Sequence, residues 1–537
     1  MCARMGEGEP LTKGMIDEAA RIAGLDFTND EREQMLEGLE TNRQAFERLR
    51  QMEFDYRLPP ALQFVPELPG RNRHIAQQPI QHASLPKVQS PADIEDCAYY
   101  SVLQLAALLR SSVVTSLQLT EMYLERLRRH DPELMCVVNL MDESAREQAR
   151  RADAEIAAGR FRSLVHGIPW GAKDLLATRQ APTTWGAMPY KEQTFDYDAA
   201  VVERLDAAGA VLIAKLSMGA LAWGDVWFGG KTRCPWNTEE GSSGSSAGPG
   251  SATAAGLVGF SIGTETHGSI ISPCRVNGIT GLRPTFGRVS RYGAMPLSWS
   301  LDKIGPMCRT AEDCAAVFGI LHGSDERDGT TVNRAFNWNA GRDIGNLRVG
   351  YLQDVFADEH DAKPQDDAAL GIFRKLGVQL KPVTLPKSDA DLLGIILAAE
   401  AAAVFDELTR SNRDDLLVRQ ITNAWPNVFR TARLIPAVEY LQANRVRRQL
   451  QEKFADLFDD VDVFLAPGRH GDTNAYTNYT GHPCVALPHG FADDGMPVSL
   501  NIIGSLCGEA DILLLARAFQ QATDFHLRQP PKFRVSG

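Results

Sequence analysis

Helix-like and strand-like patterns alternate along most of this 537-residue chain, from about Cys97 onward. Ser101 and Thr115 each begin a helix pattern, residues 199–208 predict another helix, and the apolar run 211–214 predicts a buried strand. Each such element must bury its apolar side, and an alternating order achieves this in a sheet with helices packed on it. We therefore expect an α/β fold with one large sheet and helices on both faces. Further units of the pattern are the strands 347–352, 378–383, 461–466 and 498–503 and the helices 367–376 and 510–522.

The N-terminal part of the chain does not follow this alternation. Residues 13–22 predict one helix, and Thr28 to Glu31 predict the start of a second by a capping box, in which two side chains satisfy orphan backbone amides. An apolar stripe follows at helical spacing and contains Met35, Leu39, Phe46 and Leu49. Because two helices bury little surface between them, we expect this arm to lie on the main domain or on another chain. The predicted division is a helical arm at 1–66, an extended linker with prolines and glutamines at 67–95, and the main domain at 96–537.

The composition excludes several classes of protein. The chain has 68 acidic and 56 basic side chains and a formal net charge of −12, so it has no general attraction to nucleic acid or to an anionic membrane. Its nine cysteines are scattered without a CxxC pair, which argues against a disulfide framework and a zinc site. The first residues lack the apolar core of a signal peptide, and no run of about 18 apolar residues is present. We expect a cytoplasmic protein that binds neither nucleic acid nor membrane.

The segment 241–251, GSSGSSAGPGS, is the most unusual stretch of the chain. Its composition is that of a flexible linker, but it continues directly into small residues that predict a helix at 252–256 and into an apolar run at 257–262. A phosphate-binding loop is excluded, because neither G-x-G-x-x-G nor G-x-x-x-x-G-K-[ST] is present. The remaining interpretation is that these serines take part in catalysis.

Ser269 lies 24 residues after Ser245, in the small-residue turn GTETHGSI. Small residues allow several backbone amides to point at one spot, as an oxyanion hole requires, and losing one such donor costs about 3 to 4 kcal/mol. His166 and His267 are candidates for the base, although neither Ser245 nor Ser269 lies in a G-x-S-x-G elbow. Lys173, in the largely apolar stretch GIPWGAKDLL, is another candidate. A lysine with the reference pKa of about 10.4 is charged near pH 7, and making it neutral costs roughly 4 kcal/mol. Its amine could act as a base only if burial supplied that free energy.

Three motifs together resemble the amidase signature family: GIPWGAKD with Lys173, GSSAGPGSATAAG with Ser245, and GTETHGSI with Ser269. They stand in the family's order, and the resemblance covers about residues 98–525. It implies a Ser–cis-Ser–Lys triad in which Lys173 withdraws a proton through Ser245 from the nucleophile Ser269. It also implies a cis Gly244–Ser245 peptide bond, an acyl-enzyme intermediate, a mixed sheet of about a dozen strands, and no metal or organic cofactor. The oxyanion hole implied by the resemblance consists of the backbone amides of Thr266, His267, Gly268 and Ser269.

The chain departs from the family's common Gly-Gly-Ser-Ile-Arg sequence at two positions. His267 replaces the first glycine and Ile271 replaces the arginine. Without the arginine a substrate carboxylate loses its natural partner, which favours apolar or aromatic acyl and amine groups. We expect a small-molecule amide as the substrate. The candidate residues of the substrate pocket are Trp170, Thr184, Trp185, Trp223 and Ile271.

Three functions fit these features. The first is a stand-alone amidase that cleaves carbon–nitrogen bonds and also esters or carbamates. The second is the amidase subunit of a multi-protein transamidase, because the N-terminal arm resembles the small C subunit of the bacterial glutamyl-tRNA amidotransferase. The third is a catalytically silent binding protein, which the presence of all three triad residues disfavours. We favour the first, since the missing arginine and the acidic charge argue against the second, and a homodimer is compatible with it.

Overall fold

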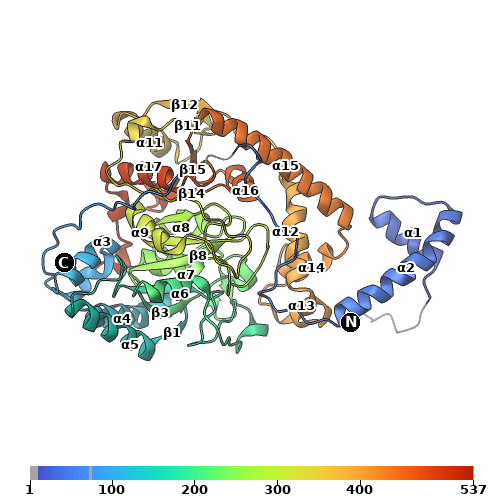
Figure 1. The fold of residues 1–537 in the computed structure, drawn as a ribbon, viewed down its shortest axis with the longest axis horizontal. Helices are drawn as coiled ribbons and strands as arrows, with labels where there is room; N and C mark the ends of the chain where they lie inside the picture. Colours follow the sequence, from blue (N-terminus) through green and yellow to red (C-terminus); the bar gives the residue numbers. More distant parts are fainter. Residues whose placement is uncertain (1–9, 72–74, 536–537) are drawn as a thin grey trace.

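One 11-stranded sheet forms the centre of the molecule in the computed structural model, which describes residues 10–71 and 75–535 (Figure 1). Its strands are β1 (Val137–Leu140), β2 (Pro169–Lys173), β3 (Val211–Leu216), β8 (Phe260–Glu265), β9 (Thr280–Arg283), β10 (Lys303–Cys308), β11 (Val349–Leu352), β12 (Leu380–Val383), β13 (Val463–Pro467), β14 (Cys484–Phe491) and β15 (Pro497–Gly504). Their spatial order is β1-β3-β2-β8-β10-β9-β14-β15-β13-β11-β12. β2 runs parallel to β3 and β8, and β11 runs parallel to β12 and β13, whereas the other neighbours are antiparallel. The predicted mixed sheet is confirmed.

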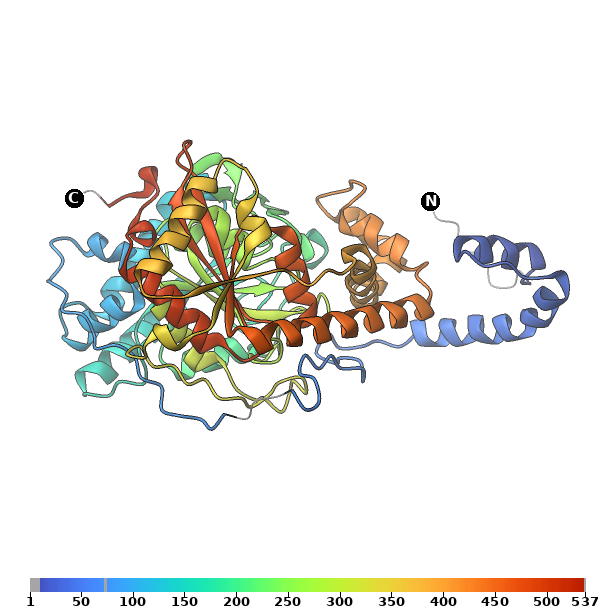
Figure 2. The same ribbon diagram turned by 90° about the horizontal axis from the view of Figure 1, so that it is seen from above.

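Helices cover both faces of the sheet (Figure 2). They are α1 (Lys13–Ile22), α2 (Asn29–Arg50), α3 (Val102–Arg110), α4 (Ser116–Leu134), α5 (Asp142–Ala157), α6 (Ala200–Ala207), α7 (Ala247–Ala254), α8 (Ile271–Asn277), α9 (Ala311–Leu321), α10 (Gln353–Ala357), α11 (Lys363–Lys375), α12 (Ala390–Val404), α13 (Asp406–Arg410), α14 (Trp425–Ala432), α15 (Ala437–Asp460), α16 (Gly471–Thr480) and α17 (Glu509–Gln521). α9 and α17 pack on each other and on central strands, while α7 and α8 form a second such pair. The α/β prediction is confirmed. Two short hairpins outside the sheet are β4 (Val226–Trp227) with β5 (Gly230–Lys231) and β6 (Arg233–Cys234) with β7 (Asn237–Gly241).

Local sequence explains where several helices begin. At Thr28, Ser101 and Thr115 the side chain accepts a hydrogen bond from the amide three residues on, and a glutamate or glutamine returns the bond. These capping boxes are the ones predicted from the sequence. The helix predicted at 252–256 begins earlier, at Ala247, because Pro249 lies in the first turn, where a missing amide costs no helical bond.

The N-terminal arm is a hairpin of α1 and α2 that projects from the body beyond the N-terminal end of α15 (Figures 1 and 2). After α2 the chain returns to the body and runs along it. Gln451 Nε2 donates to the carbonyls of Val65 and Pro66, at 3.0 and 2.9 Å, and Gln81 pairs with the backbone on either side of residue 339. The segment is therefore fastened to the body, and the division at residues 66/67 and 95/96 stays a prediction.

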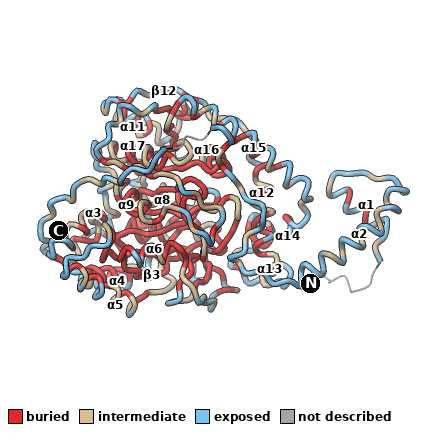
Figure 3. The backbone as a smooth tube through the Cα atoms, viewed as in Figure 1, coloured by how far each residue is buried: buried red, intermediate tan, exposed pale blue. Residues whose placement is uncertain are grey.

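Buried residues concentrate around the sheet, whereas the arm is largely exposed (Figure 3). The two core clusters contain mainly strand residues and the helix faces that cover them. Within the described part of the chain, no helix combines the length and the apolar character needed to cross a lipid bilayer.

Candidate active site

Lys173 is the last residue of β2, and its side chain is completely buried. Its Nζ lies 2.8 Å from Ser245 Oγ, 3.0 Å from Ser246 Oγ and 2.8 Å from Thr264 Oγ1. Within the described residues no carboxylate forms an ion pair with this amine. The structure therefore brings the predicted base into direct contact with the first of the two predicted serines.

Burial lowers the pKa of Lys173 well below its ordinary value, against the opposing charges of Asp302 and Glu265. A neutral amine offers two hydrogens and one lone pair. Ser246 Oγ donates its own hydrogen to the carbonyl of Thr264 (3.1 Å), so it must accept from the amine. The second amine hydrogen is taken up by Thr264, and the lone pair is left facing the hydroxyl of Ser245.

The turn before α7 delivers Ser245 to this position. The Gly244–Ser245 peptide bond is cis, as the family resemblance implies. Ser243 lies in the left-handed region with φ 60°. A Cβ at position 244 would lie 1.7 Å from the carbonyl oxygen of Gly224, so only glycine fits there.

The loop that follows β8 carries Ser269, and four of its backbone amides have no partner among the described residues. The amides of Thr266, His267, Gly268 and Ser269 donate no hydrogen bond to any residue that the structure describes. Gly268 has φ 130°, and a Cβ there would lie 2.6 Å from the side chain of Asn474. The Ser269 carbonyl accepts from the amide next to Ser245, that of residue 246, at 3.2 Å. Consecutive free amides beside a serine hydroxyl are what an oxyanion hole requires.

Glu265, the last residue of β8, holds this loop in place. Its Oε2 accepts from the amides of Ile270 and Ile271, each at 2.8 Å. Its Oε1 accepts from the side chains of Arg283 and Asn478, also at 2.8 Å each. Burial alone would raise the pKa of Glu265, but the charge of Arg283 and the amide hydrogen bond lower it below its ordinary value. A charged carboxylate thus fixes both ends of the serine-bearing loop to the core.

Ser269 opens onto a cavity of about 460 Å³, while Lys173 and Ser245 are buried behind it. His267 also lines this cavity, with its ring 5.3 Å from that of Tyr479, and burial lowers the pKa of its imidazole. Of the described residues that line the cavity, none is an aspartate, glutamate, lysine or arginine. The apolar part of the lining consists of Ala222, Trp223, Leu297, Leu397, Ala398, Trp425 and Val428. The surface that faces a substrate is therefore mostly apolar and uncharged.

Of the five residues predicted for the substrate pocket, Trp223 lines this cavity and the other four lie elsewhere. Trp170 is buried and stacks on another aromatic ring in the core. Thr184 is buried with its amide bonded to an aspartate, and Trp185 packs among four aromatic rings. Ile271 is buried at the start of α8. These four side chains stabilise the fold, because apolar residues near a motif pack in the core as readily as they line a pocket.

Several residues of the site were not predicted. Ser246 and Thr264 hold the amine of Lys173, and Glu265 holds the loop of Ser269. Thr264 and Glu265 stand inside the GTETHGSI motif, but no spacing rule marks them. Thr264 meets Lys173, 91 residues away, and Glu265 combines the nearby amides of Ile270 and Ile271 with the distant side chain of Asn478. The alternative base His166 is buried and lies 3.3 Å from Glu155, outside the cavity lining.

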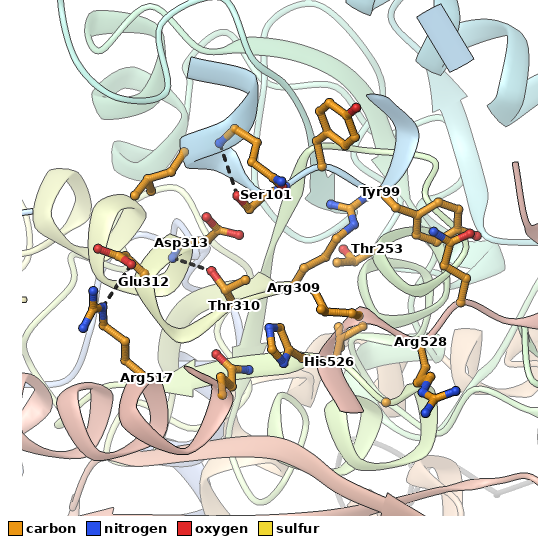
Figure 4. Close-up of a pocket in the computed structure, with 18 of the residues that line it drawn as sticks. Tyr99, Ser101, Thr253, Arg309, Thr310, Glu312, Asp313, Arg517, His526 and Arg528 are labelled. Carbon is orange, nitrogen blue, oxygen red and sulfur yellow. Dashed lines mark hydrogen bonds and ion pairs between the residues drawn. The ribbon is translucent and has the colours of Figure 1, made fainter. Parts of the chain in front are cut away.

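A larger cavity of about 660 Å³ lies elsewhere on the body (Figure 4). Several of its polar side chains have structural partners: Arg309 donates to three backbone carbonyls at 2.6 to 2.9 Å, and Thr310 accepts from the amide of Asp313 at 3.0 Å. The side-chain oxygens of Asp313 and Nδ1 of His526 are buried without a hydrogen-bond partner among the described residues. Arg517 pairs with Glu312 at 3.0 Å. Burial raises the pKa of Asp313 to about 7. None of the three predicted catalytic residues lines this cavity, so we place the candidate active site at the smaller one.

A serine beside free amides, next to a second serine in contact with a buried lysine, is the arrangement of a serine hydrolase whose base is not histidine. Comparison with known proteins agrees. The family model described as amidase matches residues 118–513. The glutamyl-tRNA(Gln) amidotransferase of Methylococcus capsulatus has an A subunit that is 35% identical over 478 residues, which cover 80% of this chain and 98% of the relative. The corresponding protein from Marinomonas is 33% identical with the same coverage.

Solved structures share the fold. The native peptide amidase from Stenotrophomonas maltophilia matches with a TM-score of 0.72 at 29% identity, covering 82% of this chain and 100% of the other. A structure described as revealing the evolutionary origins of an s-triazine catabolic enzyme matches with a TM-score of 0.73 at 28% identity, covering 79% and 98%. The chain therefore belongs to the amidase signature family, whose enzymes hydrolyse carbon–nitrogen amide bonds.

Proposed function

We propose that this protein is a stand-alone amidase in which Lys173, Ser245 and Ser269 form one proton relay. The observation that carries the proposal is the contact of 2.8 Å between the buried lysine amine and Ser245. The neutral amine accepts the proton of Ser245, which takes the proton of Ser269 as that oxygen attacks the amide carbonyl. The carbonyl oxygen becomes an oxyanion, and the free amides of residues 266–269 stabilise it.

The second half of the reaction uses the same groups in reverse. The proton passes back through Ser245 to the amine of the substrate, which leaves, and the acyl group stays on Ser269. Water then enters, loses a proton to the relay and releases the acid. In this scheme the amine of Lys173 alternates between neutral and charged forms, so a site that lowers its pKa favours catalysis near neutral pH. No metal or organic cofactor takes part in the scheme.

The substrates that fit best are amides with apolar or aromatic groups. The lining of the cavity presents tryptophan and aliphatic side chains and the imidazole of His267, and it offers no guanidinium or carboxylate. A substrate with a free carboxylate or ammonium group would leave that charge without a partner, at a cost of several kcal/mol. Aryl amides, and esters or carbamates of similar shape, avoid that cost.

A hydrolysis screen tests this proposal. Purified chain is assayed on aryl amides, aliphatic amides, carbamates and esters, with Ser269→Ala as the blank and Ser324→Ala, an exposed serine, as the matched control. We expect turnover of aryl amides by the parent and by the control, and none by Ser269→Ala. A fluorophosphonate probe should label Ser269 alone. Equal activity of parent and Ser269→Ala would show that this serine is not the nucleophile.

The relatives by sequence favour a second candidate, the amidase subunit of a multi-protein transamidase. That function predicts glutaminase activity that appears only when partner chains are added. The uncharged cavity disfavours glutamine, whose ammonium and carboxylate groups need charged partners. Turnover of amides by the purified chain alone would decide for the first candidate. The homodimer and the cytoplasmic location stay predictions.

A further inference from the structure

Two polar side chains close to the nucleophile have no role in the proposed relay. Ser272, in the first turn of α8, lines the active-site cavity, and its Oγ has no hydrogen-bond partner among the described residues. Asn474, in α16, approaches the loop of Ser269 at Gly268. A Cβ on Gly268 would lie 2.6 Å from Asn474 Nδ2 and 3.2 Å from Ser272 Oγ. Because Gly268 itself lines the cavity, both polar atoms lie beside the same part of its wall.

The side-chain amide of Asn474 is held in one orientation. Its Oδ1 accepts hydrogen bonds from Arg283 Nη1 at 3.1 Å and from Asn478 Nδ2 at 3.3 Å. Both partners are donors, so the oxygen faces them and the NH2 group faces Gly268. Nδ2 donates to no described residue, and the side chain is only partly buried. Asn474 therefore keeps a donor that a bound ligand can use.

Asn474 and Lys173 lie on opposite sides of β8. Neighbouring residues of a strand point their side chains to opposite faces of the sheet. Thr264 contacts the amine of Lys173 on one face. The next residue, Glu265, accepts on the other face from the arginine that also donates to Asn474. The loop of Ser269 follows directly after Glu265, so it runs between the relay on one side and Asn474 on the other.

The relay decides which half of the substrate faces which side, and this step rests on the proposed function. The leaving nitrogen must face Ser245, because it receives its proton from that hydroxyl. In the tetrahedral intermediate the acyl substituent then points away from Ser245, towards Ser272 and Asn474. The two free donors therefore meet the acyl half of the substrate.

We infer that Ser272 Oγ and Asn474 Nδ2 form an acyl-side subsite that binds a neutral hydrogen-bond acceptor, such as an ether or carbonyl oxygen close to the scissile carbonyl. Both groups are uncharged donors, and a substrate that offers an acceptor satisfies them when water is displaced. A carboxylate fits less well, because Arg283, the cation behind Asn474, already pairs with Glu265 at 2.8 Å. The preferred substrates are aryl amides whose acyl group carries such an oxygen.

Two substrates that differ at one atom test the subsite. Methoxyacetyl and butyryl para-nitroanilide have similar shapes, but only the first has an ether oxygen, which accepts hydrogen bonds and cannot donate them. The ratio of their kcat/KM values is compared between variant and parent, so that the different reactivities of the two carbonyls cancel. Ser272→Ala should lower this ratio about 3- to 10-fold, the effect of one lost neutral hydrogen bond.

Asn474→Asp is the second variant. It keeps an oxygen towards Arg283 and Asn478 but replaces the donor by another oxygen. The ratio should fall here too, because a carboxylate cannot donate to an ether and repels its oxygen. Ser324→Ala and Asn29→Asp, at exposed positions outside the cavity lining, are the matched controls and should keep the ratio of the parent. Thermal melts show whether each variant is folded.

The outcomes distinguish this inference from the proposed function. An unchanged ratio in folded Ser272→Ala overturns the subsite, while hydrolysis by the parent and none by Ser269→Ala still supports the amidase. An equal loss on both substrates also overturns the subsite, since it indicates a structural role. If the parent hydrolyses neither anilide, the proposed function fails and this inference fails with it.

Discussion

The proposed base is a lysine whose charge depends on the oxygen atoms around its amine. Thr264 Oγ1 lies 2.8 Å from Lys173 Nζ and stabilises the ammonium form more than the neutral form. In Thr264→Val this oxygen is lost, so the pKa of Lys173, already lowered by burial, should fall further. The relay works while the amine is neutral, and the acid limb of kcat/KM therefore moves to lower pH in the variant. A pH–rate profile of parent and variant checks this, and a limb that stays in place or moves upward contradicts it.

At the same scale, a substitution of His267 tests whether the loop of residues 266–269 acts through its backbone amides or through the imidazole side chain. Desolvation lowers the pKa of the His267 imidazole below its ordinary value, which favours the neutral ring. His267→Gly keeps the backbone amide and removes the ring from the cavity. We expect kcat on a small aryl amide to fall less than about tenfold, and KM for bulkier amides to improve because the cavity is wider. A loss near that of Ser269→Ala would instead make the imidazole part of the catalytic chemistry.

At the scale of elements, one carboxylate connects the end of β8, the loop of Ser269 and the start of α8. Glu265→Gln keeps the size of the side chain but loses the charge that four donors share. A displaced oxyanion hole loses about 2 to 3 kcal/mol, so kcat should fall roughly 30- to 150-fold with little change in KM. Glu312→Gln, beside the larger cavity, is the control. Unchanged kcat in a folded Glu265→Gln would show that the loop holds its shape without this charge.

Elements defined by short-range patterns could be predicted from the sequence, and long-range contacts could not. The capping boxes at Thr28, Ser101 and Thr115 depend on residues three positions apart, and all three are present. The partners of Lys173 lie 72 to 91 residues away, and only the family motifs connected it to Ser245. The aromatic residues assigned to the pocket show the limit of prediction from sequence. Trp223 and Trp170 both stand near a family motif, but Trp223 lines the cavity and Trp170 lies in the core.

At the scale of the whole molecule, the cavity is assembled from parts of the chain that are far apart. The base lies on β2 and the serines flank α7 and β8, whereas Leu397 of α12 and Trp425 of α14 close the opposite side. No sequence pattern places these helices over Ser269, because their packing is decided by the shape of the body as a whole. Under the proposed function, we expect substrate choice to depend mainly on α12 and α14 and the chemistry on the central strands.

Burial of the base also affects the stability of the whole fold. Lys173 has a lowered pKa in the folded protein and an ordinary one, about 10.4, in the unfolded chain. Between these two values the unfolded state binds the extra proton, so this group makes the free energy of unfolding rise with pH, by up to about 1.4 kcal/mol per pH unit. Lys173→Met removes this contribution, whereas buried Lys303, whose pKa is also lowered, contributes equally to both proteins. Urea unfolding at several pH values from about 7 to 9.5 should therefore show a steeper rise for the parent than for Lys173→Met, and parallel curves would mean that the amine is charged in the folded state.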